Sequence, residues 1–289
     1  MKQPIFSGVC TALITPFLDN KVNYPLLEQL LRFQVENGID AVVLSGTTGE
    51  SPTLSDEEKL NIFRCAKNFL GDRIPIIAGT GTNSTEHAIY LSKKAEETGV
   101  DGLLMVSPYY NKGNPDGLYR HFLAIAESVQ IPIILYNVPS RTGVDIPISV
   151  YQNLSEVPNI IGVKEATTDI TKISKIRASC ADDFYIWTGN DDQTVPVVSL
   201  GGKGVISVLS NLLPAETAMM TNAALAGDFD TASDLQCRLS GLIEALFKEP
   251  NPIPAKHAMR LIGFDCGSCR LPLGDPSPET IALLEKYLK

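Results

Sequence analysis

The sequence predicts an α/β protein, a (β/α)8 TIM barrel with a C-terminal helical appendix. Eight short apolar runs rich in β-branched residues recur along the chain, and a longer segment with helical periodicity follows each of them. The runs begin about 20 to 33 residues apart, which is the length of one strand–helix unit. Eight such units fit a closed barrel better than an open doubly wound sheet, which usually has fewer strands and stays the alternative.

The apolar runs give the expected strands in order. They show no alternation of apolar and polar residues, which is typical of strands that are buried on both faces in a parallel sheet. The eight strands are expected at Val9–Ile14, Ala41–Leu44, Ile74–Ala78, Gly102–Val106, Ile133–Tyr136, Ile160–Lys164, Phe184–Thr188 and Gly204–Ser207.

Capping residues predict where several helices begin and end. Ser55 followed by Glu58 has the spacing of a capping box and opens a helix over Asp56–Leu70, which Gly71 ends. A second helix over Ser84–Thr98 ends before Gly99 in the same way. Beyond the last strand only helices are expected, at Ala215–Ala226, Asp228–Phe247, Ala255–Ile262 and from Ser277-Pro278 onward. We therefore expect residues 1–213 to form the catalytic barrel and residues 214–289 a C-terminal helical region.

The composition excludes several classes of partner. The formal net charge is −9 and the sequence pI is about 4.9, which argues against nucleic acid or an anionic membrane as a partner. No apolar run approaches the roughly 18 residues of a membrane span, and the first residues lack the apolar stretch of a signal peptide. The six cysteines are scattered, and the Cys266–Cys269 pair lacks the second pair that a zinc ribbon needs. We expect a cytoplasmic enzyme with structural thiols.

Reactive side chains follow the predicted strands at the end where barrel enzymes place their active sites. The second strand leads into a glycine- and threonine-rich turn, the fourth into two tyrosines, the fifth into a tyrosine and an arginine, and the sixth into a lysine. These segments are Ser45-Gly46-Thr47-Thr48-Gly49-Glu50, Pro108-Tyr109-Tyr110-Asn111, Tyr136-Asn137-Val138-Pro139-Ser140-Arg141 and Lys164-Glu165.

Lys164 is the central candidate, because it ends a buried strand and projects into the barrel mouth. A lysine in water has a pKa of about 10.4 and is not nucleophilic at neutral pH. Desolvation disfavours the charged form and so favours the neutral amine that attacks a carbonyl group. An ion pair with Glu165 is the alternative for such a lysine, but the surrounding residues favour the nucleophile.

Two tyrosines and an arginine complete the chemistry. Tyr136 and Tyr110 can transfer protons during formation of a carbinolamine and its dehydration, with Thr48 linking them; their alternative role is packing. Arg141 offers a planar fork for a substrate carboxylate. The turn from Gly46 to Gly49 can hold a carboxylate with its amides and hydroxyls.

In this order and at this spacing, the motifs closely resemble the dihydrodipicolinate synthase (4-hydroxy-tetrahydrodipicolinate synthase) family, within the superfamily of Schiff-base-forming pyruvate aldolases and N-acetylneuraminate lyases. The likeness spans essentially the whole chain. One departure is Gly113, where relatives commonly carry proline. The motifs are Gly46-Thr47-Thr48-Gly49-Glu50 with Glu58, Pro108-Tyr109-Tyr110-Asn111-Lys112, Tyr136-Asn137-Val138-Pro139-Ser140-Arg141-Thr142-Gly143, Val163-Lys164-Glu165-Ala166, Gly189-Asn190-Asp191 and Asn251-Pro252-Ile253-Pro254.

The resemblance implies roles for the first half of a reaction. Lys164 would form a Schiff base with pyruvate, and Tyr136 would donate and accept protons. Thr48 and Tyr110 would complete the relay, with Tyr110 supplied by a neighbouring subunit. Thr47, Thr48 and the backbone at Ile206 would hold the pyruvate carboxylate, and Thr47 would count among the catalytic residues.

The resemblance also implies the second substrate and the assembly. The enamine would attack L-aspartate-4-semialdehyde, whose carboxylate would meet Arg141, on the diaminopimelate route to lysine. Gly189 would contribute to substrate binding. No cofactor and no metal are expected, and the family is usually a homotetramer, with a dimer as the alternative.

Regulated relatives bind lysine as an effector in a cleft between subunits. The matching positions here are Ser51, Asn83, His87 and Tyr109. At His87 those relatives typically carry a glutamate that pairs with an amine of the lysine, and a histidine supplies no negative charge. We therefore expect weak inhibition by lysine, unless Asp56 replaces the missing anion.

Three other functions are weighed against this one. N-acetylneuraminate lyases and keto-deoxy sugar-acid aldolases share the lysine and the tyrosine, but Arg141 suits an amino-acid semialdehyde better than a polyol. A metal-dependent barrel hydrolase would have only His87, His121 and His257, without an HxH pair. A nucleotide-binding module would use Gly79-Thr80-Gly81 or Gly201-Gly202-Lys203-Gly204, neither of which completes a fingerprint.

Overall fold

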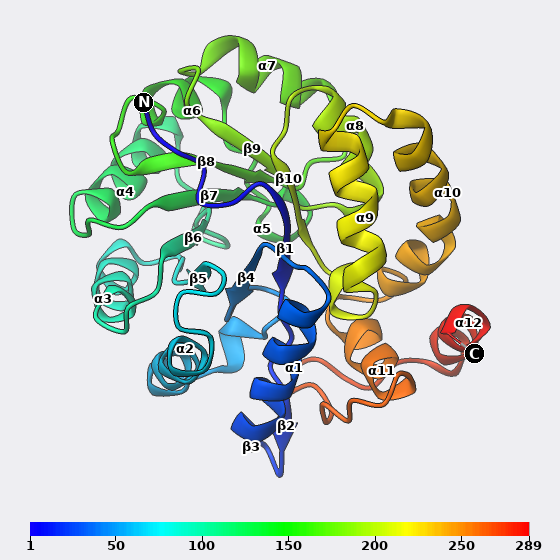
Figure 1. The fold of residues 1–289 in the computed structure, drawn as a ribbon. Helices are drawn as coiled ribbons and strands as arrows, with labels where there is room; N and C mark the ends of the chain where they lie inside the picture. Colours follow the sequence, from blue (N-terminus) through cyan, green and yellow to red (C-terminus); the bar gives the residue numbers. More distant parts are fainter. Residues whose placement is uncertain (289) are drawn as a thin grey trace.

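The computed structural model describes residues 1–288, and it confirms the closed barrel of eight parallel strands. Strand β1 pairs with both β4 and β10, which closes the sheet and excludes the open doubly wound alternative. Figure 1 shows the strands at the centre and the helices around them. The barrel strands are β1 (Gly8–Ala12), β4 (Ala41–Leu44), β5 (Ile76–Gly79), β6 (Gly102–Val106), β7 (Ile133–Asn137), β8 (Ile160–Glu165), β9 (Tyr185–Thr188) and β10 (Gly204–Ser207).

A short hairpin of β2 (Phe17–Leu18) and β3 (Lys21–Val22) was not expected from the sequence. Its strands are too short to give a periodic pattern. The turn residues Asp19 and Asn20 both have positive φ, as a two-residue hairpin turn of type I′ requires. The hairpin projects beyond α1 (Tyr24–Glu36) at one end of the molecule (Figure 1).

Helix α2 (Asp56–Leu70) has the predicted bounds. Ser55 Oγ accepts a hydrogen bond from the Glu58 backbone N–H at 3.2 Å, and the Glu58 carboxylate accepts from the Ser55 N–H at 2.9 Å, so the capping box is confirmed. The other helices of the ring are α3 (Thr85–Glu96), α4 (Pro115–Ala126), α5 (Pro139–Thr142), α6 (Ile148–Leu154), α7 (Thr171–Ser179), α8 (Thr194–Ser199) and α9 (Pro214–Leu225). Short 3-10 turns lie at η1 (Ser51–Thr53), η2 (Asp191–Gln193) and η3 (Leu209–Asn211).

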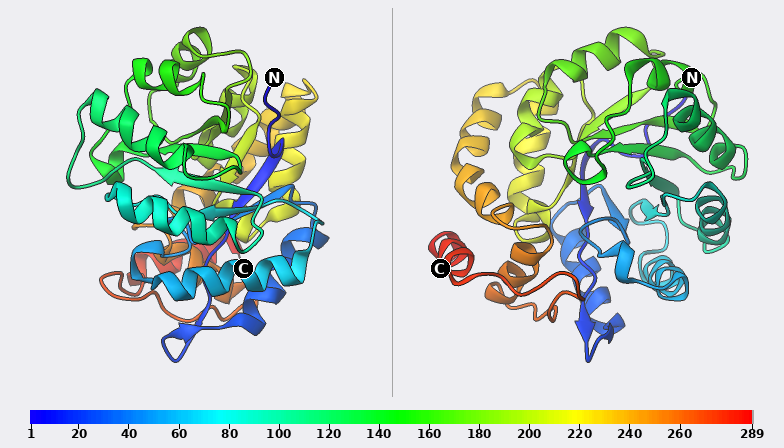
Figure 2. Two further views of the ribbon diagram at one scale, coloured as in Figure 1. Left: turned by 90° about the vertical axis from the view of Figure 1, so that its left-hand side faces the viewer. Right: turned by 180° about the vertical axis from the view of Figure 1, so that it is seen from behind.

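The last part of the chain is helical, as expected, in α10 (Phe229–Leu246), α11 (Ile253–Leu261) and α12 (Pro278–Leu288). Helix α9 packs against β1 and α8 and therefore takes the place of the barrel's eighth helix. Helix α10 lies outside α9, and α12 packs against α11 and α10 on the same side of the molecule (Figures 1 and 2). The division of the chain at residue 213 stays a prediction. Within residues 1–288 no helix has the length and apolar character that crossing a bilayer requires.

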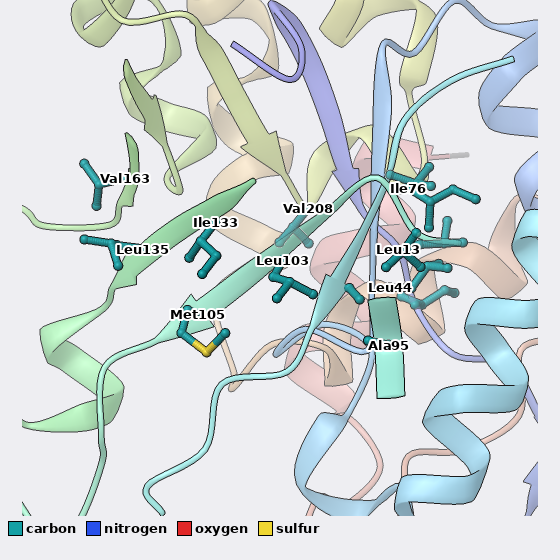
Figure 3. Close-up of a cluster of buried hydrophobic side chains, with 14 of the residues drawn as sticks. Leu13, Leu44, Ile76, Ala95, Leu103, Met105, Ile133, Leu135, Val163 and Val208 are labelled. Atoms are coloured by element: carbon teal, nitrogen blue, oxygen red, sulfur yellow. The ribbon is translucent and has the colours of Figure 1, made fainter. Parts of the chain in front are cut away.

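The core has two layers, because alternate residues of each strand point to opposite faces. Leu103 and Met105 of β6 belong to the layer between strands and helices, part of which Figure 3 shows, whereas Leu104 belongs to the barrel interior. The register between β7 and β8 shifts near Ile134, and beyond the shift Tyr136 stands directly opposite Lys164. This register places the two candidate catalytic residues side by side.

Candidate active site

Lys164 and Tyr136 lie together at the carboxyl ends of β8 and β7. The side chain of Lys164 is 5% exposed and that of Tyr136 is also buried. The Lys164 Nζ atom lies 4.5 Å from the centroid of the Tyr136 ring. The pair therefore places an amine next to a phenol inside the mouth of the barrel, where sequence reasoning expected it.

Glu165 is not the partner of Lys164. Successive residues of a strand point to opposite faces, and the buried Glu165 carboxylate accepts hydrogen bonds from Asn137 Nδ2 at 2.7 Å and from the Tyr151 hydroxyl at 3.1 Å. Its ion pair is with Lys172, at 3.6 Å. Burial raises the pKa of Glu165, while Lys172 and the two hydrogen bonds oppose that rise. The neutralising ion pair considered for Lys164 is thus absent, since Glu165 has its own partners behind the sheet.

Gly189 explains how the Lys164 side chain reaches its position. A Cβ atom added at Gly189 would lie 2.8 Å from Cε of Lys164, closer than real Cβ contacts allow. Any side chain there would displace the lysine. Ile206, the other residue expected at the site, is buried in β10 and pairs with Cys10 of β1.

A cavity of about 250 Å³ opens beside Tyr136 at the carboxyl ends of β4 to β7. Lys164 is not part of its lining, but the Tyr136 ring that contacts the lysine is. The polar and charged side chains that line it include those of Thr47, Ser51, Lys59, Tyr109, Tyr136 and Arg141.

The two threonines of the turn after β4 face different surroundings. Thr47 lines the cavity together with Tyr136. Thr48 is 2% exposed, and its Oγ1 atom accepts a hydrogen bond from Asn251 Nδ2 at 2.9 Å. The expectation that Thr48 links the two tyrosines stays a prediction; the structure shows Thr48 bonded to Asn251 and its neighbour Thr47 at the cavity.

Residues near the C-terminus hold this turn in place. Glu50, which has a positive φ, buries its carboxylate against Lys256 Nζ at 2.6 Å and accepts from the Arg270 backbone N–H at 2.8 Å. The Arg270 guanidinium in turn bonds both carboxylate oxygens of Glu58, at 2.9 and 2.6 Å. Sequence reasoning missed Lys256 and Arg270. The only signal was the motif that begins at Asn251, two residues before the helix that carries Lys256.

Arg141 and Tyr110 lie at the edge of the site. Arg141, on α5, lines the cavity and donates from Nη2 to the main-chain oxygen of Asn251 at 3.2 Å. Tyr110 has a φ of 70° and a side chain that is 91% exposed. Within one chain Tyr110 is not among the residues that line the cavity, and its part in a relay stays a prediction.

The structure brings only part of the expected effector cleft together. Ser51 and Tyr109 line the cavity, and so does Lys59. His87 turns to Asp56, with Nε2 and Oδ2 2.8 Å apart. The main-chain oxygen of Asn83 accepts from Asn111 Nδ2 at 2.9 Å. The anion that could replace a glutamate at this cleft is therefore already engaged by His87.

The cysteines and the potential metal ligands of the described chain are dispersed. In residues 1–288 no three His, Cys, Asp or Glu side chains are grouped to hold a metal ion, and the six cysteines are free thiols. Burial raises the pKa of both Cys266 and Cys269 to about 12. These two thiols stay protonated at neutral pH, as structural thiols do.

Comparison with known proteins gives one consistent result. The model of the dihydrodipicolinate synthetase family matches residues 5–289. The chain is 46% identical over 289 residues to the 4-hydroxy-tetrahydrodipicolinate synthase of Acetivibrio thermocellus, covering 100% of this chain and 98% of that one. It is 49% identical over 287 residues to the enzyme of the same name from Caldicellulosiruptor saccharolyticus, covering 99% and 97%.

Solved structures agree with the sequence relatives. Dihydrodipicolinate synthase from Thermotoga maritima superimposes with a TM-score of 0.97 at 39% identity, over 99% of this chain and 98% of that one. The chloride-inhibited enzyme from Acinetobacter baumannii, solved with pyruvate, gives a TM-score of 0.95 at 39% identity over 98% of both chains.

Proposed function

The chain belongs to the dihydrodipicolinate synthetase family and is a lyase with 4-hydroxy-tetrahydrodipicolinate synthase activity. We propose that it works through a Schiff base between pyruvate and Lys164. The observation that carries the proposal is the buried pair of Lys164 Nζ and the Tyr136 ring beside an open cavity. The Glu165 carboxylate is paired with Lys172 and accepts a hydrogen bond from Asn137, so it forms no ion pair with Lys164.

The first half-reaction consumes pyruvate. The neutral Lys164 amine attacks the C2 carbonyl carbon, and the resulting carbinolamine loses one water to form the imine. Each of these steps moves a proton to or from oxygen, which is a task for the Tyr136 hydroxyl. Thr47 shares the cavity with Tyr136 and is the residue of the turn that can pass this proton on.

The second half-reaction forms the carbon–carbon bond. Loss of a C3 proton converts the imine to an enamine, whose C3 attacks the aldehyde carbon of L-aspartate-4-semialdehyde. The aldehyde oxygen takes up a proton. Water, or the amino group of the semialdehyde, then adds to the imine carbon, and the bond from that carbon to Nζ breaks, which frees Lys164 as the amine. The guanidinium of Arg141 at the cavity rim binds the semialdehyde carboxylate.

The same site supports an assembly proposal. Tyr110 is exposed in the single chain and stands next to Tyr109, which lines the cavity. We infer that Tyr110 completes the relay of a neighbouring subunit in a homotetramer, with a dimer as the alternative. The reaction is assigned to the cytoplasm, where six free cysteines stay reduced.

Borohydride trapping tests the proposal. Reduction in the presence of pyruvate should leave a covalent adduct that peptide mass spectrometry locates on Lys164. Lys164→Arg should abolish trapping, because a guanidinium does not lose its proton in proteins. An adduct on another lysine of the wild-type chain, or none, would refute the mechanism.

Substrate choice is tested by comparing aldehydes. Turnover with pyruvate and aspartate semialdehyde, and none with pyruvate and N-acetylmannosamine, is the expected result. Arg141→Ala should lose turnover while keeping pyruvate trapping, since Arg141 contacts only the second substrate. Equal loss of both activities would place Arg141 in support of the whole site instead.

A further inference from the structure

Asn251 forms hydrogen bonds with two segments that each contribute a residue to the cavity lining, the turn after β4 and helix α5. It lies between α10 and α11, flanked by Pro250 and Pro252, and its side chain is 5% exposed. Nδ2 donates to Thr48 Oγ1 at 2.9 Å, and the main-chain oxygen accepts from Arg141 Nη2 at 3.2 Å. The side chain of Asn251 thus contacts the turn after β4, whereas its backbone contacts the arginine.

The bond to Thr48 gives the threonine hydroxyl a direction. A hydroxyl has one hydrogen and two lone pairs, so a hydroxyl that accepts from an amide keeps its own hydrogen for another acceptor. Accepting one hydrogen bond also polarises a hydroxyl as a donor. The Thr48 hydroxyl is therefore free to donate its own hydrogen to a further acceptor.

We propose that Asn251 is a positioning residue that holds the Thr48 hydroxyl as a donor to the carboxylate of the bound keto acid. This inference rests on the proposed function, in which pyruvate is the first substrate. Asn251 itself does not touch the reacting atoms; it acts through Thr48.

The surrounding contacts make this role separable from folding. Lys256, on α11, binds the Glu50 carboxylate at 2.6 Å, so the turn stays attached to α11 when the Asn251 side chain is removed. Arg141 bonds the main-chain oxygen of Asn251, and that oxygen remains in every substituted chain. Truncation of the side chain therefore removes the Thr48 contact alone.

Two substitutions change the hydrogen bond between Asn251 and Thr48 in different ways: one removes it and the other reverses its direction. Asn251→Ala removes the donor and should raise the KM for pyruvate about 3- to 10-fold, the effect of one net hydrogen bond, with kcat and the KM for the semialdehyde nearly unchanged. Asn251→Asp keeps the shape but accepts instead of donating, so it turns the Thr48 hydrogen toward itself and adds a negative charge. Its pyruvate KM should rise more than that of the alanine variant.

A double-mutant cycle with Thr48→Val separates a positioning role from a structural one. Valine keeps the branched shape of threonine without the hydroxyl. If Asn251 acts through Thr48, Asn251→Ala should have no further effect on the pyruvate KM in the Thr48→Val background. If the two substitutions multiply their effects on the pyruvate KM in the double variant, the inference is refuted.

Trapping of pyruvate by borohydride distinguishes a failure of the proposed function from a failure of the role proposed for Asn251. A wild-type chain that fails to trap pyruvate on Lys164 refutes the proposed function itself. A wild-type chain that traps pyruvate, beside an Asn251→Ala chain with an unchanged pyruvate KM, refutes only the role of Asn251. If the alanine variant does not fold, Asn251→Ser, whose hydroxyl is too short to reach Thr48, takes its place in the same measurements.

Discussion

His121 should make the protein lose stability in a defined pH range. It lies on α4, where Nδ1 is 2.9 Å from Thr85 Oγ1 at the start of α3. Its Nε2 atom is buried and has no hydrogen-bond partner in residues 1–288. Burial lowers the pKa of His121 from 6.5 to about 4, because the charged imidazolium would lack water.

The size of the effect follows from these two values. In the unfolded chain His121 takes up a proton as the pH falls below 6.5, whereas in the folded chain it does so only near pH 4. The contribution of neutral His121 is therefore fully present above pH 6.5 and is lost as the pH falls toward 4. A difference of about 2.5 pKa units corresponds to about 3.4 kcal/mol, of which about 2.5 kcal/mol is already lost at pH 4.5.

His121→Asn is the matched variant, since the asparagine amide can replace Nδ1 in the bond to Thr85 and does not titrate. Urea unfolding at pH 7, 5.5 and 4.5, at one protein concentration, measures the free energy of unfolding of both chains. Carboxylates contribute equally to both, so the difference isolates His121. Between pH 7 and pH 4.5 the wild type should lose about 2.5 kcal/mol more than the variant. Parallel pH profiles would show that His121 is not buried as a neutral ring.

Two further predictions concern the assembly and its regulation. Mixing inactive Tyr110→Phe chains with inactive Lys164→Ala chains should restore part of the activity, because hybrid assemblies contain intact sites; no recovery after verified subunit exchange would make each subunit self-sufficient. Lysine should inhibit weakly or not at all in a steady-state assay, because Asp56 is engaged by His87 at 2.8 Å and is not available to the effector. An effector amine that loses one charge-assisted hydrogen bond loses about one to two decades in affinity. Strong inhibition by sub-millimolar lysine would contradict that expectation.

The sequence by itself determined the features that depend on neighbouring residues. The eight apolar runs placed every barrel strand to within about two residues, and Ser55 with Glu58 placed the start of α2. Lys164 and Tyr136 could also be found, because each ends a buried strand and the ends of parallel strands share one face of a barrel. These inferences needed only the pattern of neighbouring residues and the rule that barrel enzymes place their active sites at the carboxyl ends of the strands.

Only the tertiary structure decided which way the side chains of the site point. The bond between Asn251 and Thr48 joins residues 203 positions apart, and the ion pair between Lys256 and Glu50 joins the same two parts of the chain. No periodicity in the sequence records such contacts, since they arise where the C-terminal helices fold back onto the turn after β4. For that reason the sequence could not show that Thr48 bonds to Asn251 while the neighbouring Thr47 lines the cavity.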